Sequence, residues 1–188
     1  MRLVVAITGA SGSIYGIRLL EVLKEKGIEV HLIVTKNAEK IIFHETGKTI
    51  NDVKSLASFC YGEEDLTALI ASGSFEFDGM IVIPCSMKTL SGIASGFAFN
   101  LVIRAADVTL KEKRNLILVP RETPLNVIHL LNMLKLAKIG AVILPPIPSF
   151  YNCPKSVDDI INHTVGRILD ILKIRHELYK KWGHHQYG

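Results

Sequence analysis

The sequence predicts a three-layer α/β fold with a mainly parallel sheet flanked by helices. Five apolar runs of four or five residues are rich in Val, Ile and Leu, and they are continuous rather than alternating. Such runs are typical of strands that are buried on both faces of a sheet. Segments with helical periodicity lie between them, and this alternation indicates βαβ units with parallel strands. We therefore expect a Rossmann-like (flavodoxin-like) arrangement.

The expected elements follow one another along the chain. Strands are predicted at 3–7, 30–34, 80–83, 116–119 and 141–144. Helices are predicted at 13–26, 124–138 and 156–173, with a further helix beginning at Ser86 and another ending with the charged run 111–114. Gly27 is a suitable stop for the first helix, and Ser156 followed by Asp159 predicts a capped start for the last. In the region 45–78 we expect short helices and loops.

Length and composition indicate an ordinary globular protein. The chain has 188 residues, of which 48% are hydrophobic and 21% charged, and a chain of this size can bury a full core. We expect one domain over 1–175 and a C-terminal tail over 176–188. The three cysteines form no C-x-x-C pair, which excludes a disulfide scaffold and a cysteine-only zinc site. The histidines show no H-x-x-x-H spacing, and no metal site is expected.

Charge and hydropathy restrict the partners that we expect. The formal net charge is +4, which favours anionic ligands, but no basic stripe with interleaved aromatic residues predicts nucleic-acid binding. No apolar stretch is long enough to cross a membrane. The apolar run 3–7 is too short for a signal peptide and leads directly into a glycine loop. We therefore expect a cytoplasmic protein that begins at Met1.

Candidate binding groups follow the predicted strands, at the edge where ligands bind in open α/β sheets. Four of the five junctions carry glycines, hydroxyls or cations, and the fifth ends in a phenol. They are 9–13, 35–37, 84–89, 120–124 and 145–151. The first opens a helix, whose N-terminal amides attract anions. Together these junctions predict a site for a phosphate-bearing ligand.

Two familiar nucleotide sites do not match this pattern. The loop Gly9–Ser13 lacks the G-x-x-x-x-G-K-[ST] spacing of a P-loop. A dinucleotide site needs an acidic residue at the end of the second strand, where Thr35 and Lys36 stand instead. Cys85 is expected to be a small buried hydrophobe rather than a nucleophile, because no histidine neighbours it in the sequence.

Six motifs taken together resemble the flavin prenyltransferases of the UbiX family, small flavoproteins associated with UbiD-type decarboxylases. They are T-G-A-S-G-S-I-Y-G-I-R-L-L at 8–20, P-C-S-M-K-T-L-S-G-I at 84–93, R-A-A-D-V-T-L-K-E-K-R at 104–114, P-R-E-T-P at 120–124, G-A-V-I-L-P-P-I-P-S-F-Y at 140–151 and P-x-S-V-D-D-I-I at 154–161. The resemblance covers residues 1–182 in the order of the family.

The resemblance implies a set of site residues. Residues implied to bind FMN are Gly9, Ala10, Ser11, Thr35, Ser86, Met87, Lys88, Thr89 and Arg121. Residues implied to bind the prenyl donor are Arg104, Lys111, Tyr151 and Arg167, and catalytic roles are implied for Glu45, Lys111, Glu122 and Trp182. Thr35 stands where Ser is common, Met87 is a variable position, and Lys181 stands where Arg is common before the tail tryptophan.

The resemblance also implies an activity. Members join a dimethylallyl group from dimethylallyl monophosphate to N5 and C6 of reduced FMN without a metal, and the prenylated FMN serves a UbiD-type decarboxylase. They are typically homododecamers with sites at subunit interfaces. Two alternatives stay open: an FMN-dependent cysteine-type decarboxylase, and a non-catalytic flavin-binding accessory subunit of an aromatic-acid decarboxylase. The cysteine-type decarboxylase is disfavoured because P-C-S-M-K-T stands where P-A-S-A-N-T is typical of those enzymes. The carrier is disfavoured because flavodoxin-like carriers are generally acidic, whereas this chain is basic.

Overall fold

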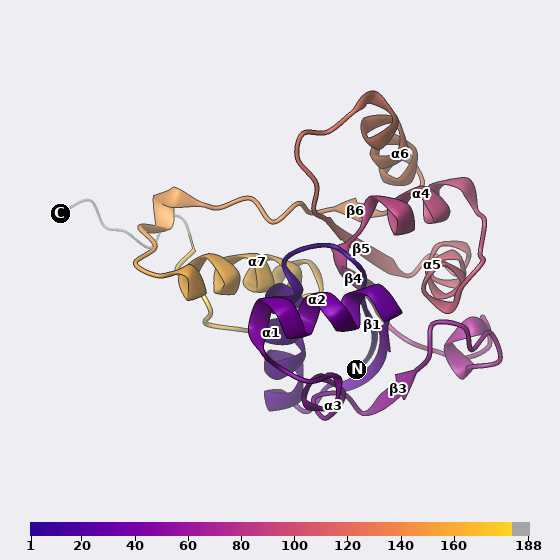
Figure 1. Ribbon diagram of the computed structural model, residues 1–188, viewed down its shortest axis with the longest axis horizontal. Helices are drawn as coiled ribbons and strands as arrows, with labels where there is room; N and C mark the ends of the chain where they lie inside the picture. Colours follow the sequence, from indigo (N-terminus) through magenta and orange to yellow (C-terminus); the bar gives the residue numbers. More distant parts are fainter. Residues whose placement is uncertain (182–188) are drawn as a thin grey trace. The chain divides into compact units, whose positions relative to one another are not determined.

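The computed structural model describes residues 1–181 and divides into two compact units, with the boundary after Pro145. The first unit contains a sheet and the helices that cover it (Figure 1). The second unit contains one long helix and the segments on either side of it. Among the described residues, no helix is long and apolar enough to span a membrane.

The sheet of the first unit has six strands, all parallel, in the order β3-β2-β1-β4-β5-β6. The strands are β1 (Arg2–Ile7), β2 (Glu29–Val34), β3 (Phe59–Tyr61), β4 (Gly79–Cys85), β5 (Asn115–Pro120) and β6 (Val142–Ile143). This order confirms the predicted Rossmann-like parallel sheet. The strand order reverses between β1 and β4, which is where ligands bind in such sheets.

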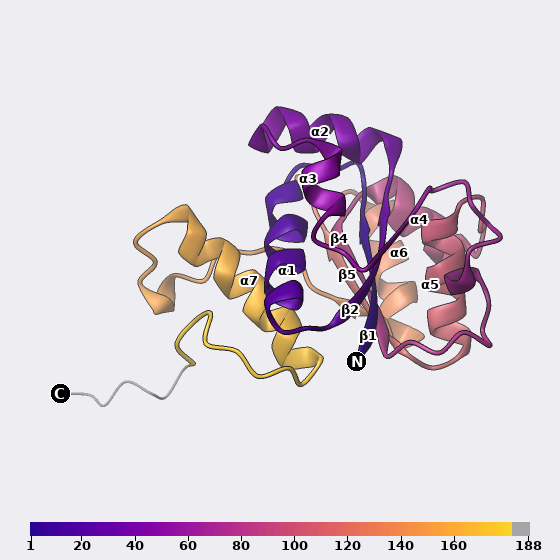
Figure 2. The ribbon, with the colours of Figure 1, turned by 90° about the horizontal axis from the view of Figure 1, so that it is seen from below.

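Helices of the first unit cover both faces of the sheet, with α1 and α2 on one face and α4, α5 and α6 on the other (Figure 2). They are α1 (Ser13–Glu25), α2 (Lys36–Thr46), α3 (Ile50–Lys54), α4 (Met87–Ser95), α5 (Leu101–Lys111) and α6 (Val127–Lys138), with a 3₁₀ turn η1 (Leu69–Ala71). The predicted stop of the first helix is confirmed, since Gly27 adopts a positive φ of 64° after it.

Three elements differ from the sequence prediction. The helix α2 was not predicted, and β3 lies in the region where only short helices and loops were expected. This strand is three residues long, sits at the sheet edge and is largely exposed, so it carries no buried apolar run. The helix α6 begins at Val127 rather than at 124, because Asn126 caps it through the amide of His129.

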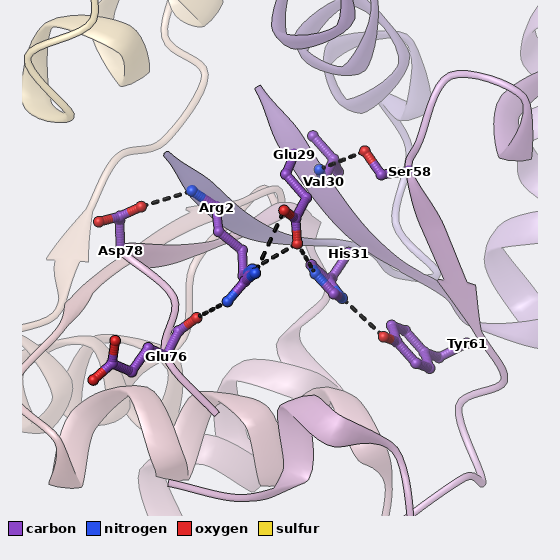
Figure 3. Close-up of polar contacts among 8 residues, drawn as sticks. All are labelled: Arg2, Glu29, Val30, His31, Ser58, Tyr61, Glu76 and Asp78. Carbon is purple, nitrogen blue, oxygen red and sulfur yellow. Dashed lines mark hydrogen bonds and ion pairs between the residues drawn. The ribbon is translucent and has the colours of Figure 1, made fainter. Parts of the chain in front are cut away.

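A polar cluster joins the first strands at the amino edge of the sheet (Figure 3). Nε of Arg2 lies 2.5 Å from Oε1 of Glu29, which is also 2.8 Å from Nε2 of the buried His31. The other ring nitrogen of His31 lies 2.8 Å from the hydroxyl of Tyr61 on β3. The amide of Arg2 donates to Asp78 at 2.6 Å. These bonds connect β3, and the segment just before β4, to β1 and β2, which are the strands that lie between them in the sheet.

The second unit contains a 3₁₀ turn η2 (Phe150–Asn152) and α7 (Val157–Ile171). Ser156 accepts a hydrogen bond from the amide of Asp159, whose carboxylate accepts one from the amide of Ser156. This capping box was predicted from the same two residues and is confirmed.

Gly16 on α1 lets this helix approach the sheet closely. A Cβ at this position would lie 2.5 Å from the carbonyl oxygen of Ile83 in β4, and a backbone atom cannot move aside as a flexible side chain can. We expect Gly16→Ala to lower the free energy of unfolding by about 1–3 kcal/mol through overpacking. Urea denaturation followed by circular dichroism measures this. Gly62→Ala is the matched control, because nothing lies within 4 Å of its added Cβ; equal stability of the two variants would contradict the expectation.

Candidate functional site

The carboxyl ends of β1 and β4 are joined by the hydroxyl of Thr8. This residue is 1% exposed. Its Oγ1 donates to the carbonyl of Pro84 at 2.8 Å and accepts from the amide of Ser86 at 2.8 Å. The glycine loop after β1 and the loop after β4 are therefore held side by side at the point where the strand order reverses. Thr8 was not among the predicted site residues.

The N-terminus of α1 binds a carboxylate of the chain itself. The two carboxylate oxygens of Glu45, on α2, accept from the amide of Gly12 at 3.1 Å, and Oε2 accepts from the amide and hydroxyl of Ser13 at 2.9 and 2.7 Å. The loop was predicted to attract an anion, and this anion is Glu45. Partial burial acts to raise the pKa of Glu45, but hydrogen bonds from Ser11, Ser13 and the amide of Gly12 outweigh it and lower this pKa below its usual value.

The N-terminus of α4 offers a second set of amides. Ser86 caps this helix by accepting from the amide of Thr89 at 3.3 Å, and its hydroxyl lies 3.1 Å from the hydroxyl of Thr89. Within residues 1–181 the amides of Met87 and Lys88 have no acceptor. The ammonium of Lys88 lies 5.2 Å from the ring centre of Phe99. These donors and the positive end of the helix dipole suit a phosphate group.

Thr35 and Arg121 lie at the ends of the neighbouring strands. Thr35 caps α2 by accepting from the amide of Ala38 at 3.4 Å. The amide of Arg121 donates to the carbonyl of Cys85 at 3.3 Å, which holds the end of β5 beside the end of β4. The side chains of Arg121 and Glu122 are exposed. The thiol of Cys85 is fully buried and its pKa is raised by desolvation, which fits the expected structural role.

Arg104 and Lys111, both on α5, bond to partners outside the loops that follow β1, β2, β4 and β5. Nε of Arg104 donates to the carbonyl of Ala71 at 3.0 Å, and Nη1 lies 2.8 Å from Asp107. Lys111 ends α5 just before β5 begins, so it lies at the amino edge of the sheet, where Nζ is 2.5 Å from Oε1 of Glu112. Within a single copy of the first unit, Lys111 therefore lies at the opposite edge of the sheet from the loops that carry Ser86 and Arg121.

The second unit brings Tyr151 and Arg167 into one polar cluster. The hydroxyl of Tyr151 lies 3.2 Å from Nε2 of His163, and the rings of His163 and Tyr179 have centres 4.6 Å apart. Nη1 of Arg167 lies 3.5 Å from the hydroxyl of Tyr179 and 3.3 Å from Asp170. A cavity of about 760 Å³ is lined by His163, Tyr179 and three lysines of this unit. Trp182 lies outside the described residues.

The donors of the first unit suit a phosphate-bearing ligand. Gly9 comes so close to α2 that a Cβ there would lie 2.8 Å from Cβ of Asn37, so the loop exposes backbone rather than a side chain. The loop after β4 offers the amides of Met87 and Lys88, which have no acceptor among residues 1–181, and the hydroxyls of Ser86 and Thr89. Arg121, after β5, adds a cation. No group of three or more His, Cys, Asp or Glu residues that could hold a metal ion is found in the described part of the chain.

Comparison with known proteins decides the family. The flavoprotein family model matches residues 1–174. A UbiX flavin prenyltransferase of Methanocaldococcus jannaschii is 55% identical over 183 residues, which cover 97% of this chain and 99% of the relative. The chain belongs to the UbiX flavin prenyltransferase family. The mitochondrial flavin prenyltransferase of Saccharomyces cerevisiae is 51% identical over 181 residues, covering 96% of this chain and 75% of that protein. These matches confirm the family that the sequence motifs indicated.

Two solved structures of UbiX proteins have the same fold. AnUbiX in complex with FMN and dimethylallyl pyrophosphate superposes with a TM-score of 0.96 at 47% identity, covering 98% of each chain. A dodecameric FMN-dependent UbiX-like decarboxylase of Escherichia coli O157:H7 superposes with a TM-score of 0.95 at 51% identity, covering 97% of this chain and 99% of that one. A peptidyl-cysteine decarboxylase at 18% identity and a TM-score of 0.60 shares the fold alone.

Removal of the Thr8 hydroxyl should loosen the joint between β1 and β4. Thr8→Val keeps the side-chain shape but leaves the amide of Ser86 without its acceptor, so we expect a loss of about 2 kcal/mol in the free energy of unfolding. Urea denaturation measures it. The control is Thr67→Val, because the hydroxyl of Thr67 bonds only to the nearby Asp65 on the surface. Equal stability of both variants would show that the Thr8 bridge contributes nothing.

Proposed function

We propose that this chain transfers a dimethylallyl group from dimethylallyl monophosphate to N5 and C6 of reduced FMN, and that a UbiD-type decarboxylase uses the prenylated FMN. The observation that carries the proposal is the match over almost the whole chain to named flavin prenyltransferases, one of which is 55% identical. The fold of AnUbiX, which binds FMN and dimethylallyl pyrophosphate, supports it. A cytoplasmic location stays a prediction.

FMN is proposed to bind at the carboxyl edge between β1 and β4. The flavin supplies the nucleophilic ring that receives the prenyl group. The residues proposed to hold it are Gly9, Ala10, Ser11, Thr35, Ser86, Met87, Lys88, Thr89 and Arg121. The amides of α4 and the guanidinium of Arg121 would hold the phosphate, because the α1 amides are already bonded to Glu45. Ser86 and Thr35 keep the two helix ends rigid by capping them.

Arg104, Lys111, Tyr151 and Arg167 are proposed to bind the phosphate of the prenyl donor. The allylic C–O bond breaks as negative charge accumulates on the departing phosphate, and fixed cations stabilise that charge most when water is excluded. Protein cations suffice for this role, so the proposal includes no metal. Arg167 offers a planar fork suited to phosphate oxygens, and Lys111 offers a compact charge. Trp182, for which the resemblance implies a catalytic role, is proposed to cover the site as part of the C-terminal tail.

Glu45 and Glu122 are proposed to move protons. The lowered pKa of Glu45 keeps it ionised at neutral pH, so it can accept a proton but has none to donate at the start of the reaction. Its hydrogen bonds to Gly12 and Ser13 also fix its position beside the glycine loop. Glu122 lies next to Arg121 at the end of β5, with its carboxylate bonded to the amide of Thr123 at 3.0 Å.

Several copies of the chain are proposed to share each site in a homo-oligomer, which we infer to be a dodecamer. The helix α6 leaves a row of large apolar side chains exposed, and monomers rarely expose such a patch. They are Val127, Ile128, Leu130, Leu131 and Leu134. The dodecameric relative supports burial of this row by further copies. Lys111, at the amino edge, would reach the site of a neighbouring copy.

A second candidate function is decarboxylation. Two structural relatives carry that name: the UbiX-like decarboxylase of Escherichia coli O157:H7, and a phenylacrylic acid decarboxylase of Aquifex aeolicus at 44% identity and a TM-score of 0.86. An accessory role in an aromatic-acid decarboxylase is compatible with flavin prenylation, because the product serves a partner enzyme. Release of CO₂ by the purified chain from a phenolic acid or a cysteine-type substrate would favour direct decarboxylation.

Mass measurement of the flavin tests the proposal directly. The protein is mixed anaerobically with FMN, dithionite and dimethylallyl monophosphate, and the flavin is released and weighed. We expect a gain of one dimethylallyl unit, and a much smaller yield from Arg121→Ala because the FMN phosphate loses a cation. Unmodified flavin with both the monophosphate and the pyrophosphate would contradict the proposed function.

Mixing of two inactive variants tests whether copies share sites. Lys111→Ala and Arg121→Ala should each lose most activity alone. Random co-assembly after mild dissociation should restore about a quarter of the sites, because each site needs an intact residue from each of two copies. Mixtures with no more activity than the separate variants would show that one copy provides both residues.

A further inference from the structure

The carboxylate of Asp170 accepts hydrogen bonds from four side chains of the second unit. Nη1 of Arg167 lies 3.3 Å from Oδ2, and the hydroxyl of Tyr179 donates to the same oxygen. Nε2 of His176 lies 3.2 Å and Nζ of Lys181 lies 2.9 Å from Oδ1. Arg167 is on α7, whereas the other three donors follow the helix. One carboxylate therefore ties the chain after α7 to the helix and to Arg167.

Gly166 provides a second, independent sign that residues 174–181 pack closely on α7. A Cβ at Gly166 would lie 2.6 Å from Cδ1 of Tyr179 and 2.8 Å from Cε1 of His176. Both distances are shorter than real Cβ contacts, so these two rings lie where only a glycine leaves room. A glycine inside a helix costs about 1 kcal/mol relative to alanine, and close packing of the two rings offsets that cost.

Asp170 also orients the guanidinium of Arg167. Within residues 1–181, both hydrogen bonds of this guanidinium use Nη1. The edge formed by Nη2 and Nε takes part in neither bond, and this edge is the fork that binds two phosphate oxygens at once. Tyr151 is linked to Arg167 through two ring residues: its hydroxyl lies 3.2 Å from His163, whose ring contacts that of Tyr179, which in turn lies 3.5 Å from Arg167. The two proposed phosphate ligands of this unit therefore belong to one cluster.

The ionisation state of Asp170 agrees with this geometry. Partial burial acts to raise its pKa, but the hydrogen bonds from Tyr179, Lys181 and His176 outweigh this and lower the pKa to about 2. A carboxyl group whose pKa is lowered in the folded state stabilises that state above its unfolded pKa of about 4, and the contribution disappears as the pH falls toward 2. Asp170 is therefore a carboxylate at neutral pH.

We propose that Asp170 is a positioning residue for the donor phosphate: it turns Arg167 so that the Nη2–Nε edge is presented to the phosphate, and it anchors residues 174–181 on α7. The choice of phosphate as the ligand of Arg167 rests on the proposed function, whereas the anchoring does not. Without Asp170, Arg167 and Lys181 lose their common anion and repel each other, and the segment loses its central hydrogen-bond acceptor.

Steady-state kinetics with reduced FMN tests the orientation of Arg167. We expect Asp170→Asn to raise the KM for dimethylallyl monophosphate about tenfold and to change kcat less than about threefold, with FMN affinity unchanged. The matched control is Asp158→Asn, the same change at an exposed position in the first turn of α7, with a KM within about twofold of wild type. A purely structural Asp170 would reduce the amount of active enzyme and leave this KM unchanged.

Hydrogen exchange measured by mass spectrometry tests the anchoring without any reaction. In Asp170→Ala the amides of residues 176–181 should exchange at least about tenfold faster than in wild type, while peptides from β1 and β4 keep their rates. Gly166→Ala should give the same result without a change of charge, because its Cβ displaces the rings of Tyr179 and His176.

The two measurements separate this proposal from the proposed function. An unchanged KM in Asp170→Asn would overturn the positioning role, and unchanged exchange in both Asp170→Ala and Gly166→Ala would overturn the anchoring. If the wild-type protein does not alkylate FMN, the proposed function is wrong and the role toward phosphate is wrong with it. The exchange rates would still decide whether Asp170 anchors residues 174–181.

Discussion

The hydroxyl of Thr8 makes the structural connection on which the rest of the first unit's site depends. A parallel sheet brings the carboxyl ends of its strands to one edge, but it does not by itself set the spacing of the loops there. Thr8 sets this spacing, because its hydroxyl donates to the carbonyl of Pro84 and accepts from the amide of Ser86. The bond to Pro84 is buried and the bond from Ser86 is partly buried, so loss of either partner leaves a polar group that is shielded from water without its hydrogen bond. The glycine loop and the α4 N-terminus therefore act as one rigid surface.

The N-termini of α1, α2 and α4 lie at the carboxyl edge of the sheet. They differ in whether a carboxylate of the chain accepts hydrogen bonds from their amides. Glu45 occupies the amides of α1, and Glu63 accepts from the amide of Lys36 at the start of α2 at 2.9 Å. The start of α4 has a serine cap but no carboxylate among the described residues. Because the amides of α1 and α2 are already bonded to carboxylates, the start of α4 is the end that we propose for the FMN phosphate. The two carboxylates thus distinguish three otherwise similar helix ends.

Local patterns in the sequence predicted most of the fold, and non-local contacts account for the rest. Buried strands such as β1 and β4 have continuous apolar runs because both of their faces are covered. The short edge strand β3 has no such run, because it is held by pairing with β2 and by the bond from Tyr61 to His31. In the site, loop residues were predictable from their place after strands. The contact of Glu45 with Gly12 spans more than thirty residues, and no local pattern reports it.

The candidate cations for the donor phosphate each have a carboxylate neighbour in the chain: Arg104 has Asp107, Lys111 has Glu112 and Arg167 has Asp170. The side chains of these cations are between 37% and 51% exposed, and such ion pairs contribute about 0–1 kcal/mol each. They hold the side chains in place at little energetic cost to ligand binding. A lone anion would gain little by displacing the carboxylate from one of these ion pairs. Under the proposed function, a donor phosphate that met several of these cations at once would gain a contact from each of them and so would bind where a lone ion would not.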